Sequence, residues 1–178
     1  MLVRVSDGSA PVNAAFQFRV RAPMPIASKD VALIKSGDLW RYWVNPLPVV
    51  PRVGVVDFTA PDLDDRAWQT GYSQLGYGDG DEAGLIPALP YRVTTYFRKA
   101  FTVANPAEFS ALRLRFLRDD GAVVYLNGTA IATSNMPRTY DESTPAVTDI
   151  TGTGEDTWIT STESVATLRA GVNVIAVE

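Results

Sequence analysis

The chain has 178 residues, of which 46% are hydrophobic and 10% aromatic, and this composition is typical of a globular protein with one sizeable core. Its net charge is −4 and its lysines and arginines do not cluster, so nucleic acid is excluded as an expected partner. No apolar run approaches the roughly 20 residues that cross a bilayer, so no membrane span is predicted. The absence of cysteine and histidine excludes disulfides, thiolate or imidazole metal sites, and Ser–His–Asp catalysis.

Residues 1–21 have the pattern of a hairpin. In its second strand Phe16, Phe18 and Val20 alternate with polar residues, which is the period of a half-buried strand. Because a lone hairpin is marginal in water, we interpret it as the end of a preceding domain, and it resembles the last hairpin of an immunoglobulin- or cadherin-like domain. Residues 22–35, stiffened by two prolines, would then be a linker. The alternative is that these strands join the main sheet.

From residue 36 onwards the sequence predicts one all-β domain of short strands separated by turns. The expected strands, in chain order, are residues 38–44, 94–103, 111–117, 122–126, 129–132, 157–161 and 168–178. A long glycine-rich loop is expected at residues 71–84, and an irregular one at residues 135–156. This spacing is typical of an antiparallel β-sandwich.

The last predicted strand, residues 168–178, is apolar on both faces and is therefore expected at the centre of a sheet. The chain stops within this strand, which favours a sandwich that is truncated at its C-terminus. An export signal, if the protein is secreted, is expected upstream of this sequence.

Asn127-Gly128 stands between two apolar runs and predicts a tight hairpin turn. Shortly before it, Asp119 and Asp120 form an acidic pair. Adjacent residues point in divergent directions, whereas the two carboxylates of a glycosidase face each other across about 5–9 Å. We therefore predict that the pair holds a turn by accepting backbone N–H bonds, with Arg98 or Arg118 as its ion-pair partner.

Five segments together carry a family resemblance. They are Leu75-Gly-Tyr-Gly-Asp79, Thr94-Thr-Tyr-Phe-Arg-Lys99, Leu117-Arg-Asp-Asp-Gly121, Val123-Val-Tyr-Leu-Asn-Gly128 and Gly171-Val-Asn-Val-Ile-Ala-Val-Glu178. In this order they resemble the bacterial jelly-roll modules of the galactose-binding-domain-like superfamily, over residues 36–178. The resemblance implies an accessory module without catalytic activity in a secreted protein, beside a phosphoesterase, glycosidase or lamin-tail domain. The loop at residues 83–92 is shorter than usual for these modules.

Loop aromatics are the side chains best suited to a sugar ligand, since rings stack on the C–H faces of sugars while polar groups bind the hydroxyls. The tryptophans at positions 40, 43 and 158 fall on predicted strands and are expected in the core. The candidate binding residues are those of the loops, Tyr72, Tyr77, Tyr91, Arg138 and Tyr140. The alternative for each loop tyrosine is that it caps the sandwich.

The acidic loop at residues 78–82 is a candidate cation site. Asp79, Asp81 and Glu82 are spaced closely enough by glycine to place several oxygens around a hard cation such as structural Ca²⁺. The alternative is a solvated loop whose charge adds to solubility.

Three classes of function remain open from the sequence. The first is an extracellular or cell-surface accessory module that binds carbohydrate weakly, without catalysis. The second is a structural spacer that packs against a neighbouring domain of the same polypeptide, which predicts an exposed apolar patch. The third is a carboxylate-based glycosidase, or a fragment of a larger hydrolase, which needs two facing carboxylates in a cleft.

Overall fold

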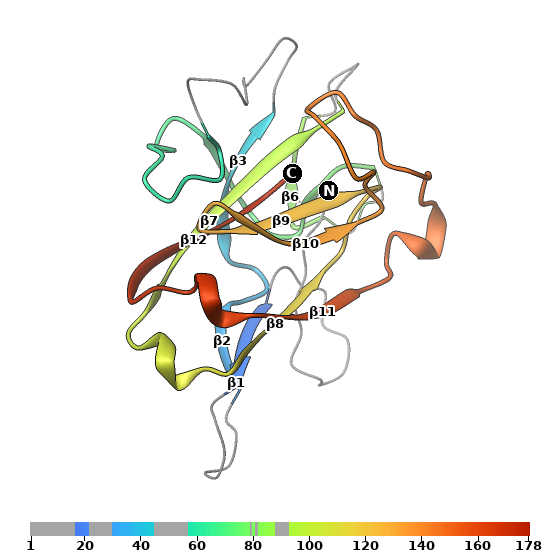
Figure 1. Ribbon diagram of the computed structural model, residues 1–178. Helices are drawn as coiled ribbons and strands as arrows, with labels where there is room; N and C mark the ends of the chain where they lie inside the picture. Colours follow the sequence, from blue (N-terminus) through green and yellow to red (C-terminus); the bar gives the residue numbers. More distant parts are fainter. Residues whose placement is uncertain (1–16, 22–29, 45–56, 79, 81, 88–92) are drawn as a thin grey trace.

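The computed structural model describes residues 17–21, 30–44, 57–78, 80, 82–87 and 93–178 (Figure 1). These residues form β-strands and turns with three short 3-10 helices, at Pro106–Glu108, Gly152–Gly154 and Val165–Thr167. The described part contains no α-helix, which confirms the predicted all-β class. No helix of this part is long and apolar enough to span a membrane.

The largest sheet has six strands, each antiparallel to its neighbours. Their order is β10 (Thr129–Ser134), β9 (Ala122–Leu126), β12 (Gly171–Val177), β7 (Thr95–Val103), β3 (Leu39–Val44) and β4 (Gln69–Tyr72). The expected central position of the last strand is confirmed, because β12 lies between β9 and β7.

Two smaller sheets complete the described structure. The antiparallel four-stranded sheet has the order β11 (Ile159–Glu163), β8 (Ala111–Phe116), β1 (Gln17–Arg21) and β2 (Val31–Ile34). The third sheet pairs β5 (Leu75–Gly76) with β6 (Gly84–Leu85) in parallel.

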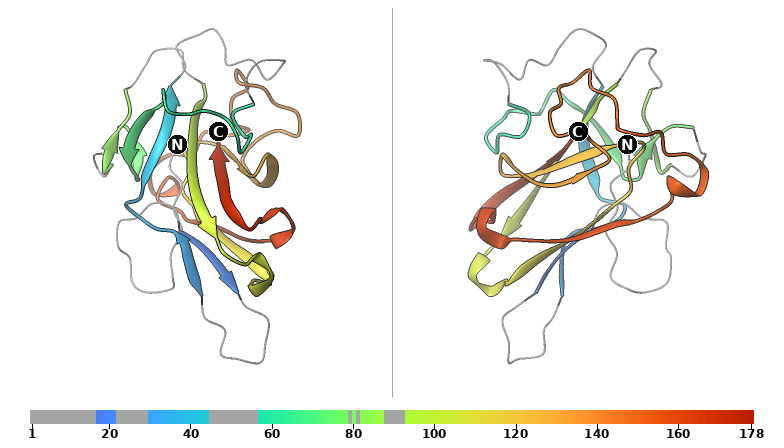
Figure 2. Two further views of the ribbon diagram at one scale, coloured as in Figure 1. Left: turned by 90° about the vertical axis from the view of Figure 1, so that its left-hand side faces the viewer. Right: turned by 45° about the vertical axis from the view of Figure 1, so that its right-hand side comes forward.

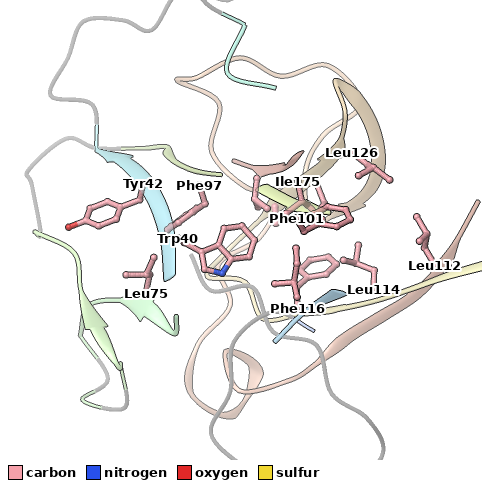
Figure 3. Close-up of a cluster of buried hydrophobic side chains, with 14 of the residues drawn as sticks. Trp40, Tyr42, Leu75, Phe97, Phe101, Leu112, Leu114, Phe116, Leu126 and Ile175 are labelled. Atoms are coloured by element: carbon pink, nitrogen blue, oxygen red, sulfur yellow. The ribbon is translucent and has the colours of Figure 1, made fainter. Parts of the chain in front are cut away.

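One hydrophobic core is shared by the two larger sheets. The strand predicted at residues 111–117 is confirmed as β8, in which Leu112, Leu114 and Phe116 alternate with two arginines and are fully buried. They belong to the same cluster as Trp40 of β3 and Ile175 of β12 (Figure 3). Successive residues of a strand point to opposite faces, so β3, β8 and β9 each give every second side chain to this core.

The six-stranded sheet is also covered on its other face. A second cluster consists of Phe58, Tyr96, Val123, Tyr125 and Ala176. All of them except Phe58 stand on strands, where they alternate with members of the first cluster. The loop at residues 57–68 contributes the Phe58 ring, which lies 4.7 Å from the Tyr96 ring between centroids. The central strands are therefore buried on both faces, as their continuous apolar sequence requires.

The hairpin between β9 and β10 has the predicted geometry. Asn127 and Gly128 both have positive φ, at 51° and 88°, and Leu126 pairs with Thr129 across the turn. Asparagine and glycine are the residues that adopt this conformation at least cost.

The strand Gln17–Arg21 does not remain apart from the main sheets. It pairs with β8 on one side and with β2 on the other, which corresponds to the alternative that the sequence left open for it. Val31–Ile34, within the predicted linker, is a strand whose Ile34 is fully buried in the core. Residues 1–16 and 22–29 lie outside the described part, so the predicted preceding domain stays a prediction.

Two other expectations about local structure need correction. The predicted loop at residues 71–84 contains the short strand β5 and borders β4 and β6, because backbone bonds join Gln74 to Gly84 and Gly76 to Ile86. The strand predicted at residues 157–161 begins two residues later. Thr157 is used in the preceding turn, where its N–H and hydroxyl bind the carbonyls of Gly154 and Thr153.

Candidate functional site

The irregular loop at residues 135–156 forms one wall of the candidate site, and Figure 2 shows it in orange beside the end of β12. Asn135, with a φ of 55°, anchors the loop at its start. Its amide nitrogen donates to the carbonyls of Asp120 and Thr148 at 3.1 and 2.6 Å, and its amide oxygen accepts from the Thr148 hydroxyl at 3.0 Å. Side-chain bonds thus replace a regular ladder in this loop.

The acidic turn before β9 holds the other end of this loop. Asp120 accepts the backbone N–H of Ile150, 30 residues further along the chain, through Oδ1, so it holds the loop rather than its own turn as predicted. The side chain of Asp119 accepts no backbone N–H of a described residue. At Gly121 an added Cβ would lie 2.6 Å from Met136 Sδ and 3.2 Å from the Asn135 carbonyl. Glycine at this position therefore permits the loop to approach the turn closely.

We expect Asp120→Ala to lower the free energy of unfolding by about 1–2 kcal/mol, because the partly buried Ile150 N–H loses its acceptor. Hydrogen exchange should rise mainly in residues 135–156. Asp119→Ala is the matched control, since Asp119 is exposed and its side chain has no hydrogen bond to another described residue. Equal losses for the two variants in urea denaturation would contradict this role of Asp120.

A pocket of about 340 Å³ lies between this loop, the acidic turn and the β5 region. Its lining includes Tyr77 and Tyr140, and we call it the tyrosine pocket. Gln74, Thr94 and Glu178 also line it, so segments far apart in the sequence meet here. The Thr94 hydroxyl fastens the loop over the pocket by donating to the Glu142 carbonyl at 2.8 Å.

Two residues of the pocket lining, Tyr140 and Glu178, are joined by hydrogen bonds through Tyr125, which does not itself line the pocket. The Tyr125 hydroxyl donates to Oε1 of Glu178, which is only 7% exposed. Since its single hydrogen is used there, Tyr140 is the donor in the 3.0 Å bond between the two phenols. Burial, followed by the hydrogen bond to Glu178, raises the pKa of the Tyr125 phenol above its usual range. The proton therefore stays on Tyr125, where it orients the glutamate.

Most of the charged groups that line the pocket are acidic. Among the described residues that line it, seven are carboxylates and Arg118 alone is cationic. The carboxylates are Glu82, Asp119, Asp120, Asp141, Glu155, Asp156 and Glu178. Sequence reasoning did not assign Glu178 or the acidic residues of the 135–156 loop to a site, because their convergence depends on tertiary structure.

The predicted binding residues fall into three groups. Tyr77 and Tyr140 come together in the pocket, with Tyr77 45% exposed. Tyr72 is 61% exposed on β4 and Arg138 is exposed, but neither lines the pocket. Tyr91 lies outside the described residues.

The predicted calcium site is only partly within the described structure. Glu82 lines the pocket and accepts the Gly80 N–H at 3.0 Å. Asp79 and Asp81 lie outside the described residues, and no group of three potential metal ligands occurs within them. The calcium site stays a prediction.

The expected arginine partners of the acidic pair were wrong. Arg98 binds Asp65 and two backbone carbonyls, on the face of the sheet that the 57–68 loop covers. Arg118 Nε donates to the Ser134 hydroxyl at 3.2 Å. Arg98 stands on β7, and successive side chains of a strand alternate between faces, so its partners come from the loop packed on its own face.

Comparison with known proteins gives no family. No family model matches the chain, and no curated protein matches it. Among solved structures, a β-glucuronidase from an uncultured Clostridium species is similar over 99% of this chain, with 13% identity and a TM-score of 0.42. The chain spans only 23% of that protein. No family assignment follows at this level of similarity.

Proposed function

We propose that the chain is a non-catalytic accessory module of a secreted or cell-surface protein, and that it binds carbohydrate weakly in the tyrosine pocket. The observation that carries this proposal is that Tyr77 and Tyr140 line one pocket together with polar groups. Tyrosine rings supply surfaces for the C–H faces of a sugar, and carboxylate and amide groups bind its hydroxyls.

The dimensions of the pocket support a small ligand. A volume of about 340 Å³ lies at the lower end of the roughly 300–1,000 Å³ range of small-molecule sites. The pocket is also partly pre-formed, because Tyr140 is held by Tyr125 and Asp141 by its own turn bonds to Ser143 and Thr144. A site that needs little ordering loses less free energy on binding.

The fold that we propose for this module is a jelly-roll β-sandwich. In support, the antiparallel six-stranded and four-stranded sheets share one hydrophobic core. The proposed site is built by loops and strand ends, where functional residues of such folds commonly occur.

The direct test is titration of the purified chain with a panel of oligosaccharides, followed by isothermal calorimetry or by NMR. We expect Tyr77→Ala to weaken binding about fivefold, because a stacking ring contributes on the order of 1 kcal/mol. Tyr72→Ala is the matched control, an exposed tyrosine that does not line the pocket. The proposal fails if no glycan binds, or if the two substitutions have the same effect.

A second candidate function is docking of a neighbouring domain, and one observation favours it. Leu39 and Tyr72 are 45% and 61% exposed and lie directly opposite each other on β3 and the edge strand β4. Side chains at opposed positions of an antiparallel pair stand on the same face, so the two form an exposed apolar surface. If no glycan binds, this surface becomes the first place to look for a partner domain.

A further inference from the structure

The charge of the tyrosine pocket bears on which sugars it can accept. Seven carboxylates line it, against the one guanidinium of Arg118 among the described residues. Like charges gathered on a concave surface reinforce one another, since the low-dielectric walls focus the field into the pocket. A ligand entering this pocket therefore meets a negative potential.

The carboxylates differ in whether they already accept hydrogen bonds from other residues of the protein. Asp120, Asp141 and Glu178 accept hydrogen bonds from Ile150, Ser143 and Tyr125 and so help to build the walls.

Two other carboxylates of the lining have no such role in the walls. Asp119 and Asp156 are exposed, and neither side chain is hydrogen-bonded to another described residue. Their oxygens are therefore available to a ligand that carries donors.

A sugar that carries a carboxylate or sulfate would meet repulsion from this lining, and among the described residues that line the pocket it would find only Arg118 as a counter-ion. A sugar that carries an ammonium group would instead make charge-assisted hydrogen bonds, which are shorter and stronger than neutral ones. A neutral sugar falls between these cases, since carboxylates also accept from hydroxyls.

We propose that the tyrosine pocket selects glycans by charge, binding basic amino sugars in preference to neutral sugars and excluding acidic ones. The inference rests on the proposed carbohydrate-binding function and names the class of ligand for that same pocket. Asp119 and Asp156 are the specificity-determining residues, because they combine exposure at the pocket with unused acceptor oxygens.

The test compares ligands of one size that differ in charge. Tetramers of glucosamine, N-acetylglucosamine and galacturonic acid are titrated into the chain at a mildly acidic pH, where the glucosamine amine is a cation. We expect the glucosamine tetramer to bind about tenfold more tightly than its acetylated form, and the galacturonic acid tetramer not to bind. The preference should shrink as salt is raised, because exposed charges are screened.

The double variant Asp119→Asn and Asp156→Asn keeps the shape of both side chains and removes two charges. It should lower the preference for glucosamine several-fold and leave the affinity for N-acetylglucosamine nearly unchanged. Asp62→Asn is the matched control, an exposed aspartate outside the pocket lining.

The other outcomes overturn the inference in distinguishable ways. Equal binding of the three tetramers, or an unchanged preference in the double variant, refutes charge selection and leaves carbohydrate binding intact. If tetralysine binds as tightly as tetraglucosamine, the attraction is electrostatic without sugar selection. If none of the sugars binds, the proposed function fails together with the inference.

Discussion

Arg98→Met is expected to lower the free energy of unfolding by about 3–5 kcal/mol, because it removes three hydrogen bonds of a buried guanidinium group and takes this donor from two backbone carbonyls. The Arg98 side chain is only 1% exposed, and its Nε donates to Asp65 at 3.0 Å. Its two terminal nitrogens donate to the carbonyls of Phe58 and Ala60. Methionine fills a similar volume, so the loss would measure these polar contacts rather than a cavity.

The destabilisation caused by Arg98→Met should be greatest in the 57–68 loop. The guanidinium carbon lies 5.9 Å from the centre of the Trp68 ring, and all its hydrogen-bond partners belong to the 57–68 loop. We therefore expect the variant to free this loop first, seen as faster hydrogen exchange in the loop and a change in tryptophan fluorescence.

The matched control is Arg66→Met, which breaks another arginine–aspartate pair of the same loop. Arg66 is 84% exposed and its pair with Asp64 is a surface contact, so its loss should change the free energy of unfolding far less than the loss of Arg98. If the two variants were equally stable in urea denaturation, Arg98 would not hold the loop as described.

Asn173→Ala should have an effect of similar size, a loss of about 3 kcal/mol or more, because it leaves several buried groups without partners. Asn173 is fully buried on β12. Its amide nitrogen donates to the carbonyls of Arg169 and Gly171 at 2.8 and 3.1 Å. Its amide oxygen accepts from the Arg169 N–H and from Asn127 Nδ2, both at 2.8 Å.

Asn127 continues this network across the sheet, since it donates to the Thr167 carbonyl and accepts the Val174 N–H. Each single variant, Asn173→Ala or Asn127→Gly, should lower the free energy of unfolding. The sum of the two decreases should exceed the decrease in the double variant, because both substitutions break the same network. Glycine is chosen at position 127 because it tolerates the positive φ of this turn.

Asn105→Ala serves as the control for an exposed asparagine. Asn105 caps the 3-10 helix Pro106–Glu108 by accepting the Ala107 N–H at 3.1 Å, and its loss should cost only about 1 kcal/mol. Additive losses at positions 127 and 173, or a loss at 173 no larger than at 105, would argue against a cooperative network.

Most strands were predictable because their signals are local. Alternation placed β8 and its buried Leu112, Leu114 and Phe116, and the Asn-Gly turn placed the hairpin of β9 and β10. The pairing of β1 with β8 was not predictable in this way. It joins Gln17 to Arg115, and no local pattern specifies a contact over such a separation.

The candidate site was predicted only in part, because the sequence shows local signals but not which distant segments meet. Aromatic residues in loops indicated Tyr77 and Tyr140, which do share one pocket, but the same signal also indicated Tyr72, which does not line it. The buried network of Asn173 could have been predicted from the sequence, although it was not. A lone amide within an apolar central strand must find buried partners, and this requirement would have indicated the network.

The backbone of Glu178 makes two hydrogen bonds to Val123, at 2.9 and 3.1 Å, while its side chain lines the tyrosine pocket. The pocket is thus attached to the central ladder of the large sheet, and its formation is thermodynamically linked to global folding. A ligand that binds only this native form would stabilise the whole chain by mass action. At a glycan concentration ten times the dissociation constant the gain would be about 1.4 kcal/mol, so thermal melting could reveal even a millimolar ligand.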